Sequence, residues 1–251
     1  VATHTSWGWS NGKYFTEDKQ YKKLLKAYSN VVKYGLPGNQ PITLTEKPKE
    51  ISPVYVDIDL KLSMEKHRIE DGKLYSDSLI GSLVKIYQEG ARKYLDIEED
   101  HLICCVFEKD GLEDKKPYWG NGIHLLFPNL IVNSKVRHLI RNYVVCNSKK
   151  NGLFTKYDNP VEDIIDIAVV ERNNIMLFGS KKPNSKYYYD YTFCYNSMVE
   201  NIDITAIFSN EQPSVYDYVN MFSVRRKHHC KDYEILLNNN YNNKLIDIEY
   251  K

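Results

Sequence analysis

Two aspartates stand one strand repeat apart in an otherwise apolar stretch, residues 53–62. Apolar and polar side chains alternate along it: Val54, Val56, Ile58 and Leu60 against Tyr55, Asp57, Asp59 and Lys61. As a strand, the stretch would turn its apolar side to a core and set Asp57 and Asp59 together on the other face, about 6.5–7 Å apart along the backbone. Carboxylates that close repel each other unless a cation lies between them, and Mg²⁺ or Mn²⁺ prefers such oxygen ligands. The alternative is a surface strand with two solvated aspartates, although aspartate is depleted in strands.

Two more residues with useful chemistry are predicted on the same face. His124 and Asp166 each lie between two aliphatic residues, in strands predicted at 120–128 and 163–170. Three carboxylates on adjacent strands can hold two hard cations, which activate a 3′-hydroxyl and stabilise a leaving pyrophosphate. His124 would then contact the triphosphate of an incoming nucleotide, and Gly122 would let the backbone approach the ligand closely. The alternative for a lone histidine is a structural role.

A candidate phosphate-binding segment follows a further strand, predicted at 174–178. The strand ends at Gly179, and a hydroxyl and two cations come directly after it, from Ser180, Lys181 and Lys182. Small residues and cations at the end of a strand suit phosphate binding. The alternative is an ordinary turn with exposed lysines.

The hydrophobic periodicity predicts the elements that must position these residues. Helices are predicted at 18–34, 76–95, 133–146 and 214–223, and strands at 53–62, 102–107, 120–128, 163–170, 174–178 and 186–195. The strands at 163–170 and 174–178 are predicted to form a hairpin. From residue 51 the order is strand, helix, two strands, helix and further strands, which indicates an α+β fold. We expect a mostly antiparallel sheet with two helices on one face, and an open face that carries the polar side chains.

Length and composition describe an ordinary globular chain. Its 251 residues are 42% hydrophobic and 27% charged, with a net charge of +1, which argues against a generally basic surface but allows a local basic groove. It has no apolar run of about 18 residues, and five cysteines without a Cys-x-x-Cys pair indicate reduced thiols in an intracellular protein. The chain does not begin with Met, so we expect it to be part of a longer protein. We predict an N-terminal extension at 1–50, a core at 51–210 and a C-terminal segment at 211–251.

Taken in order, four short motifs resemble those of the archaeo-eukaryotic primase superfamily. More narrowly, the chain is similar to the primase portion of the primase-helicase proteins of poxviruses, asfarviruses and giant viruses. The motifs are an Asp-x-Asp strand (Asp57, Asp59), a Gly-x-His strand (Gly122, His124), an Ile-Asp strand (Ile165, Asp166) and a Gly-Ser-x-Lys segment (Gly179, Ser180, Lys182). The resemblance covers about residues 50–200. It implies an RRM-like α+β core and a DNA primase, with possible primer-extending polymerase activity, that acts in viral DNA replication in the host cytoplasm or nucleus.

The resemblance also implies roles for single residues and for partners. Asp57, Asp59 and Asp166 would hold two Mg²⁺ or Mn²⁺ ions, and His124 would bind the nucleotide phosphates. A second group would lie beside the nucleotide: Ser180, Lys181 and Lys182, with Arg172 as the nearest match to an arginine that many relatives carry before the glycine. Single-stranded DNA would be the template and NTP or dNTP the substrate. A superfamily 3 helicase domain is expected in the same full-length chain.

Other interpretations of the sequence stay open. Some relatives carry zinc, but three consecutive ligands, His228, His229 and Cys230, cannot easily all reach one tetrahedral ion, so structural zinc is not expected. Residues 225–229 suit a basic contact with template DNA, or a solvated charge run with no function. Two alternative functions are a non-catalytic module that binds single-stranded nucleic acid and another Asp-x-Asp metal enzyme, such as a nuclease.

Overall fold

The computed structural model describes residues 2–7, 11–183, 185–208, 212–225 and 237. Its strands are β1 (His4–Ser6), β2 (Gly12–Tyr14), β3 (Thr45–Glu46), β4 (Ile51–Ser63), β5 (Cys104–Lys109), β6 (Glu113–Lys115), β7 (Tyr118–Asn133), β8 (Ile175–Met176), β9 (Tyr189–Tyr195) and β10 (Asn201–Ile202). Its α-helices are α1 (Asp18–Tyr34), α2 (Asp77–Tyr94), α3 (Ser134–Lys150), α4 (Val161–Ile164), α5 (Ala168–Glu171) and α6 (Val215–Met221). Short 3₁₀ helices are η2 (Pro37–Asn39), η3 (Ile69–Asp71), η4 (Glu99–Leu102) and η5 (Ile204–Ile207).

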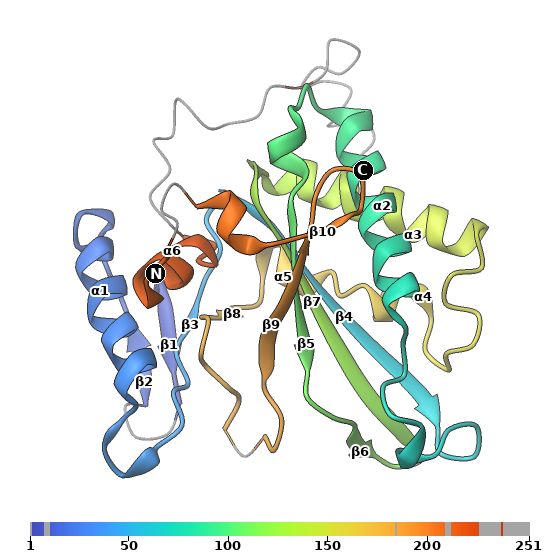
Figure 1. The fold of residues 1–251 in the computed structure, drawn as a ribbon, viewed down its shortest axis with the longest axis horizontal. Coiled ribbons are helices and arrows are strands. Elements are labelled where there is room, and N and C mark those ends of the chain that lie inside the picture. Colours follow the sequence, from blue (N-terminus) through green and yellow to red (C-terminus); the bar gives the residue numbers. More distant parts are fainter. Residues whose placement is uncertain (1, 8–10, 184, 209–211, 226–236, 238–251) are drawn as a thin grey trace.

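These elements form a mixed α+β fold with two antiparallel sheets (Figure 1). The larger sheet has the order β10-β9-β5-β7-β4, with β6 paired to β7, and the smaller one has the order β2-β1-β3-β8. The predicted helices at 18–34, 76–95 and 133–146 are confirmed as α1, α2 and α3. No helix among the described residues is long and apolar enough to cross a membrane.

The apolar face of the larger sheet forms the main core with α2 and α3. Val56, Ile58 and Leu60 of β4 are 3%, 0% and 1% exposed, so the predicted alternation is confirmed. The core continues into α2 and α3 through Ile80, Leu83, Val84, Leu139 and Ile140. Both helices lie on the same side of the sheet, as predicted (Figure 1).

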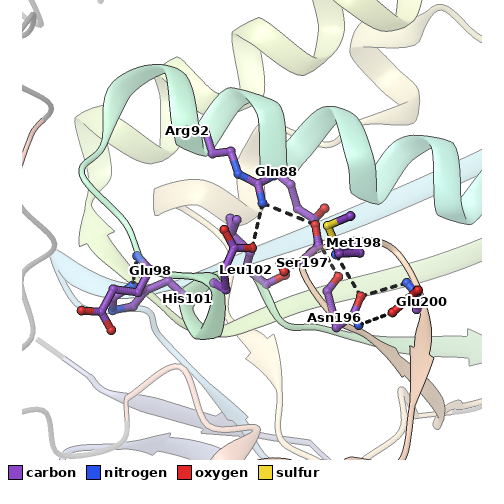
Figure 2. A network of polar contacts seen from close by, with 10 residues as sticks. Gln88, Arg92, Glu98, His101, Leu102, Asn196, Ser197, Met198 and Glu200 are labelled. Carbon is purple, nitrogen blue, oxygen red and sulfur yellow. Dashed lines mark hydrogen bonds and ion pairs between the residues drawn. The ribbon is translucent and has the colours of Figure 1, made fainter.

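Polar contacts fix the C-terminal half of α2 to the segments that flank β5 and β9 (Figure 2). The Gln88 side-chain amide donates to the carbonyls of Leu102 and Asn196, at 3.0 and 2.9 Å. One turn later, Arg92 donates to the carbonyl of Ser197 at 3.4 Å. A buried amide with two acceptors is satisfied as a donor, so Gln88 stabilises the packing instead of weakening it. The contacts join α2 to η4, which leads into β5, and to the turn after β9.

The predicted strand at 163–170 is wrong. The helices α4 and α5 take its place, and only Ile165 pairs with the sheet, through an isolated bridge to Ile58. The Asp166 carboxylate accepts a hydrogen bond from the Ala168 backbone N–H at 2.8 Å. Such a local turn competes with the strand ladder for the backbone. The predicted hairpin is wrong as well, because β8 pairs with β3 in the smaller sheet.

We expected the second face of the larger sheet to be open. The structure shows that it is partly covered. A second apolar cluster packs there and includes Cys105, Phe107, Leu126, Ile175, Cys194, Ile204, Phe222 and Val224. Its members come from the sheet and from β8, η5 and the segment after α6. The described cysteines, Cys104, Cys105, Cys146 and Cys194, are free thiols. Part of the polar face of the sheet therefore lies beneath elements of the smaller sheet and of the C-terminal part of the described chain.

Candidate active site

Asp57 and His124 lie directly opposite each other on the second face of the larger sheet. In the antiparallel pair of β4 and β7, Asp57 is the register partner of His124, and Asp59 is the partner of Gly122. Opposed residues in such a pair point to the same face. The Nε2 atom of His124 lies 3.3 Å from Oδ1 of Asp57, an ion-pair distance without hydrogen-bond geometry. The structure thus brings together two predicted site residues that are far apart in the sequence.

A cavity of about 480 Å³ opens over this pair, between the two sheets. Six predicted site residues line it: Asp57, His124, Arg172, Ser180, Lys181 and Lys182. Asp59 and Asp166 are not among its lining residues. Aromatic side chains from β4, β5, β9 and the end of α6 form much of the remaining wall. The volume falls in the range of about 300–1,000 Å³ that is usual for small-molecule sites.

The imidazole of His124 is held between two tyrosines. The Tyr189 ring stacks on it with a centroid distance of 3.3 Å and an interplanar angle of 21°, and Tyr55 lies on it at 5.3 Å in a tilted contact. Tyr189 reaches from β9 because Gly122 has no side chain. A Cβ atom at Gly122 would lie 2.0 Å from the Tyr189 hydroxyl oxygen. The space that the sequence assigned to a ligand at this glycine is therefore filled by Tyr189, which orients His124.

The pKa values of the two carboxylates of the Asp-x-Asp motif shift in opposite directions. Burial would raise the pKa of Asp57, but the interaction with His124, followed by the charges of Lys182 and Lys109, lowers it below its usual value. Burial, and then the neighbouring charge of Asp57, raise the pKa of Asp59. The first carboxylate is thus kept ionised by the protein, whereas the second lacks enough compensating charge. A cation bound between them would supply that charge.

The backbone of Asp166 lies beside that of Asp57. Its N–H donates to the Asp57 carbonyl at 3.0 Å, next to the bridge between Ile58 and Ile165. Because Ile58 and Ile165 both face the core, residues 57 and 166 are expected on the opposite face of the sheet. Arg141 of α3 fixes this segment and donates to the carbonyl of Ile165 at 2.7 and 3.2 Å.

The donor set around Asp57 fits a hard cation in part. Oδ1 of Asp57 is buried and has no hydrogen-bond partner among the described residues, and a divalent cation is a suitable partner for such an oxygen. Asp59 stands on the same face with a raised pKa. Asp166, however, uses Oδ1 to accept from Ala168. Within the described part of the chain, no three His, Cys, Asp or Glu side chains are already grouped to hold a metal ion.

The predicted phosphate-binding residues Arg172, Ser180, Lys181 and Lys182 all line the cavity. Lys182 is exposed, and its charge lowers the pKa of Asp57. The Ser180 hydroxyl is buried and bonded to Tyr28 of α1 at 2.7 Å, so it is anchored to that helix. Arg172, at the end of α5, is exposed. Together with Lys181, these residues give the cavity a cationic wall that faces a carboxylate.

Sequence reasoning missed Lys109, the last residue of β5. Its side chain is only 8% exposed, and Nζ donates to Glu113 Oε1 at 2.9 Å and lies 5.0 Å from the Tyr189 ring centroid. It lines the cavity and lowers the pKa of both Asp57 and Asp59. Phe107 pairs with His124 across the sheet, so the two-residue period of β5 puts Lys109 on that face. That periodicity was the signal in the sequence.

The candidate zinc ligands and most of the basic run at 225–229 lie outside the described residues. These are His228, His229 and Cys230, with residues 226 and 227. Arg225 is described, and its guanidinium donates to the Lys47 carbonyl at 2.7 Å. That contact fixes the segment after α6 to the residue that directly follows β3.

Comparisons with known proteins identify a family that the chain matches and three similar viral proteins. The family model described as "C962R protein N-terminal AEP domain" matches residues 3–195. Three relatives carry the name "Putative helicase": L207/L206 of Acanthamoeba polyphaga mimivirus, 25% identical over 229 residues, 121R of Invertebrate iridescent virus 3, 26% over 225, and 184R of Invertebrate iridescent virus 6, 25% over 226. The matches cover 89%, 82% and 83% of this chain but only 23%, 22% and 23% of the relatives. The chain therefore spans less than a quarter of their length.

Proposed function

Because the chain belongs to the family of the C962R protein N-terminal AEP domain, we propose that it is the primase domain of a viral primase-helicase. AEP denotes the archaeo-eukaryotic primases, which are nucleotidyltransferases. The proposed reaction is template-directed formation of a bond between a 3′-oxygen and the α-phosphorus of a nucleotide, with release of pyrophosphate. The observation that carries the proposal is the position of Asp57 and His124 at the base of a cavity with a cationic wall.

In this proposal Asp57 and Asp59 hold the catalytic divalent cations, and Asp166 completes the ligand set. The cations would lower the pKa of the attacking hydroxyl and neutralise charge on the leaving group. Lys181, Lys182 and Arg172 lie where they can bind the triphosphate. His124, fixed by its tyrosine neighbours, would donate a hydrogen bond to a phosphate oxygen. Such a site works chiefly by positioning and charge neutralisation.

The topology supports an RRM-like core within the proposed limits 51–210. Along the chain, β4, α2, β5, β7 and α3 follow the β-α-β-β-α-β motif, and the bridge at Ile165 stands where its last strand would be. In space, β5, β7, β4 and this bridge lie side by side, while β9 adds to the other edge. The segments 1–50 and 211–251 would be an N-terminal extension and a link to a helicase domain. The names of the relatives support such a domain in the full-length chain.

Primer synthesis on single-stranded DNA tests the proposal. The protein is incubated with Mn²⁺ or Mg²⁺, template and labelled NTP or dNTP, and the products are separated on a gel. We expect Asp57→Ala, Asp59→Ala and Asp166→Ala each to reduce product at least about 100-fold, since each removes charge that positions the reacting groups. Thermal unfolding checks that each variant is folded. Full activity of all three variants would overturn the proposed mechanism.

One observation favours a second candidate, a non-catalytic module that binds single-stranded nucleic acid. The described residues contain no preformed group of three metal-ligating side chains. This candidate predicts metal-independent DNA binding and no product with any nucleotide. A nuclease would instead shorten the labelled template, so the same gel separates the three functions.

A further inference from the structure

The outer face of α1 carries a continuous stripe of lysines. They are Lys19, Lys22, Lys23, Lys26 and Lys33, and all are exposed. Lys19, Lys23, Lys26 and Lys33 follow one another at steps of four, three and seven residues, and Lys22 lies three residues after Lys19, so all five lie on one side of the helix. With a rise of about 1.5 Å per residue, the stripe is about 21 Å long. The sequence predicted this helix but assigned no function to it.

The charge of this stripe is largely uncompensated. Lys19 forms an ion pair with Glu17 at 2.8 Å. The one acid of α1, Asp18, forms an ion pair with Lys49 at 3.0 Å. The other four lysines of the stripe form no ion pair with any described residue. The helix holds five lysines and one aspartate, whereas the whole chain has a net charge of +1. The rest of the protein is therefore net acidic, and α1 is a local cationic surface that attracts a polyanion.

The apolar face of α1 packs against the rest of the protein. This packing argues against a membrane surface as the polyanion that α1 binds. Tyr21, Leu25 and Tyr28 are at most 5% exposed. The Tyr28 hydroxyl bonds to the Ser180 hydroxyl and to the Phe178 carbonyl, at 2.7 and 2.9 Å. A helix that binds a membrane surface must bury its apolar face in lipid, and this face is not available. The contacts also fix α1 to the segment that lines the catalytic cavity.

An exposed aromatic ring stands at the end of the stripe. Tyr34 is 75% exposed, and the Lys33 ammonium lies 5.0 Å from its ring centroid. Surfaces for single-stranded nucleic acid combine lysines along the backbone path with aromatic rings on which bases stack. We propose that the outer face of α1 is a binding site for the phosphate backbone of single-stranded nucleic acid. If the proposed function holds, this site would anchor the template beside the cavity.

Replacement of the four lysines that form no ion pair with a described residue tests the site. The variant Lys22→Gln, Lys23→Gln, Lys26→Gln, Lys33→Gln keeps a good helix former at each exposed position, so the fold is retained. Binding of a fluorescent oligothymidylate of about 30 nucleotides is measured by anisotropy between about 50 and 200 mM salt. We expect a Kd about tenfold or more above wild type, and a slope of log K against log salt that is smaller by about 3, because each lost single-strand contact removes about 0.7.

The control variant neutralises three exposed lysines elsewhere, as Lys85→Gln, Lys150→Gln, Lys156→Gln. These lysines are exposed on α2, at the end of α3 and just after it, across the molecule from α1 (Figure 1). The control should bind as wild type does. Equal Kd and salt slope for the α1 variant and wild type would overturn the proposal. So would loss of binding to phosphatidylserine vesicles with DNA binding unchanged.

Primer synthesis separates this proposal from the proposed function. If both hold, the α1 variant has a raised template KM and an unchanged kcat at saturating template. If the wild type makes no product, the proposed function fails, but the binding comparison still decides whether α1 is the site.

Discussion

At the scale of single residues, the site depends on contacts that hold His124 in place. Tyr189 stacks on the imidazole, and its hydroxyl occupies the space over Gly122. A side chain at position 122 would push Tyr189 away through its hydroxyl, the atom nearest to the added Cβ. The glycine is therefore required for packing and not for backbone conformation. The sequence predicted His124 and Gly122 as one motif. It could not show that Tyr189 contacts both, with its ring on His124 and its hydroxyl over Gly122.

A double substitution tests this arrangement. We expect Gly122→Ala to raise the nucleotide KM about tenfold, equivalent to about 1.4 kcal/mol, because the displaced Tyr189 no longer orients His124. Tyr189→Phe alone should have little effect, since the ring still stacks. The double variant should recover in part, because the nearest atom to the added Cβ is then the ring carbon Cζ at 3.0 Å, a contact that a small shift of the ring relieves. Steady-state primer synthesis measures KM and kcat, and a double variant as impaired as Gly122→Ala would contradict the role of Tyr189.

At the scale of elements, the sequence predicted best where burial follows a simple period. The alternation along β4 predicted its faces correctly, and so placed Asp57 and Asp59 opposite the core. The same argument failed at 163–170, where an apolar run suggested a strand. There the carbonyls of Ile165 and Val170 accept from arginines of α3, and no local pattern signals such a long-range contact. Lys109 was missed because the predicted strand ended at residue 107, whereas β5 continues to Lys109.

Arg141 is the element-scale contact with the clearest consequence. It is 8% exposed and donates to the carbonyls of Ile165 and Glu162, on either side of the turn that leads to Asp166. Arg141→Met would leave these acceptors unsatisfied, at about 1–3 kcal/mol each. We expect a Tm lower by about 2–4 °C per kcal/mol lost. Because Asp166 would also lose its position, more Mn²⁺ should be needed for half-maximal primer synthesis.

Arg92→Met is the matched control, since Arg92 is an exposed arginine of α2 that also donates to a backbone carbonyl (Figure 2). Its Mn²⁺ dependence should equal that of wild type. If Arg141→Met lowers the Tm but leaves the Mn²⁺ dependence unchanged, Arg141 stabilises the fold without positioning Asp166.

At the scale of the whole molecule, a buried carboxyl joins the N-terminal elements to the segment that follows α6. Glu46 of β3 is 0% exposed and accepts hydrogen bonds from Tyr21, from Ser223 at 3.0 Å and from the Val224 N–H at 2.7 Å. Burial raises the pKa of Glu46 above its ordinary value of 4.5. The folded state thus favours the protonated form. This contribution to stability is complete below pH 4.5 and is lost as pH rises through the higher folded-state pKa.

Glu46→Gln should remove that dependence. As pH rises above about 4.5, we expect the free energy of unfolding of wild type to fall relative to the variant, by at most about 1.4 kcal/mol per pH unit for one proton. Urea unfolding at several pH values measures the difference. Glu89→Gln, at an exposed position of α2, serves as the control and should leave the wild-type dependence unchanged. Parallel curves for wild type and Glu46→Gln would contradict the assignment.

Binding of Mn²⁺ in the presence of a non-hydrolysable nucleotide, followed by electron paramagnetic resonance, tests the central claim most directly. The claim is that Asp57, Asp59 and Asp166 share cations beside a nucleotide cavity. We expect the wild type to bind two ions, Asp57→Asn and Asp59→Asn to lose tight binding, and Asp166→Asn to bind fewer ions or to bind them more weakly. Asp163→Asn, at an exposed position three residues away, should match wild type. Wild-type binding by Asp166→Asn would contradict the account.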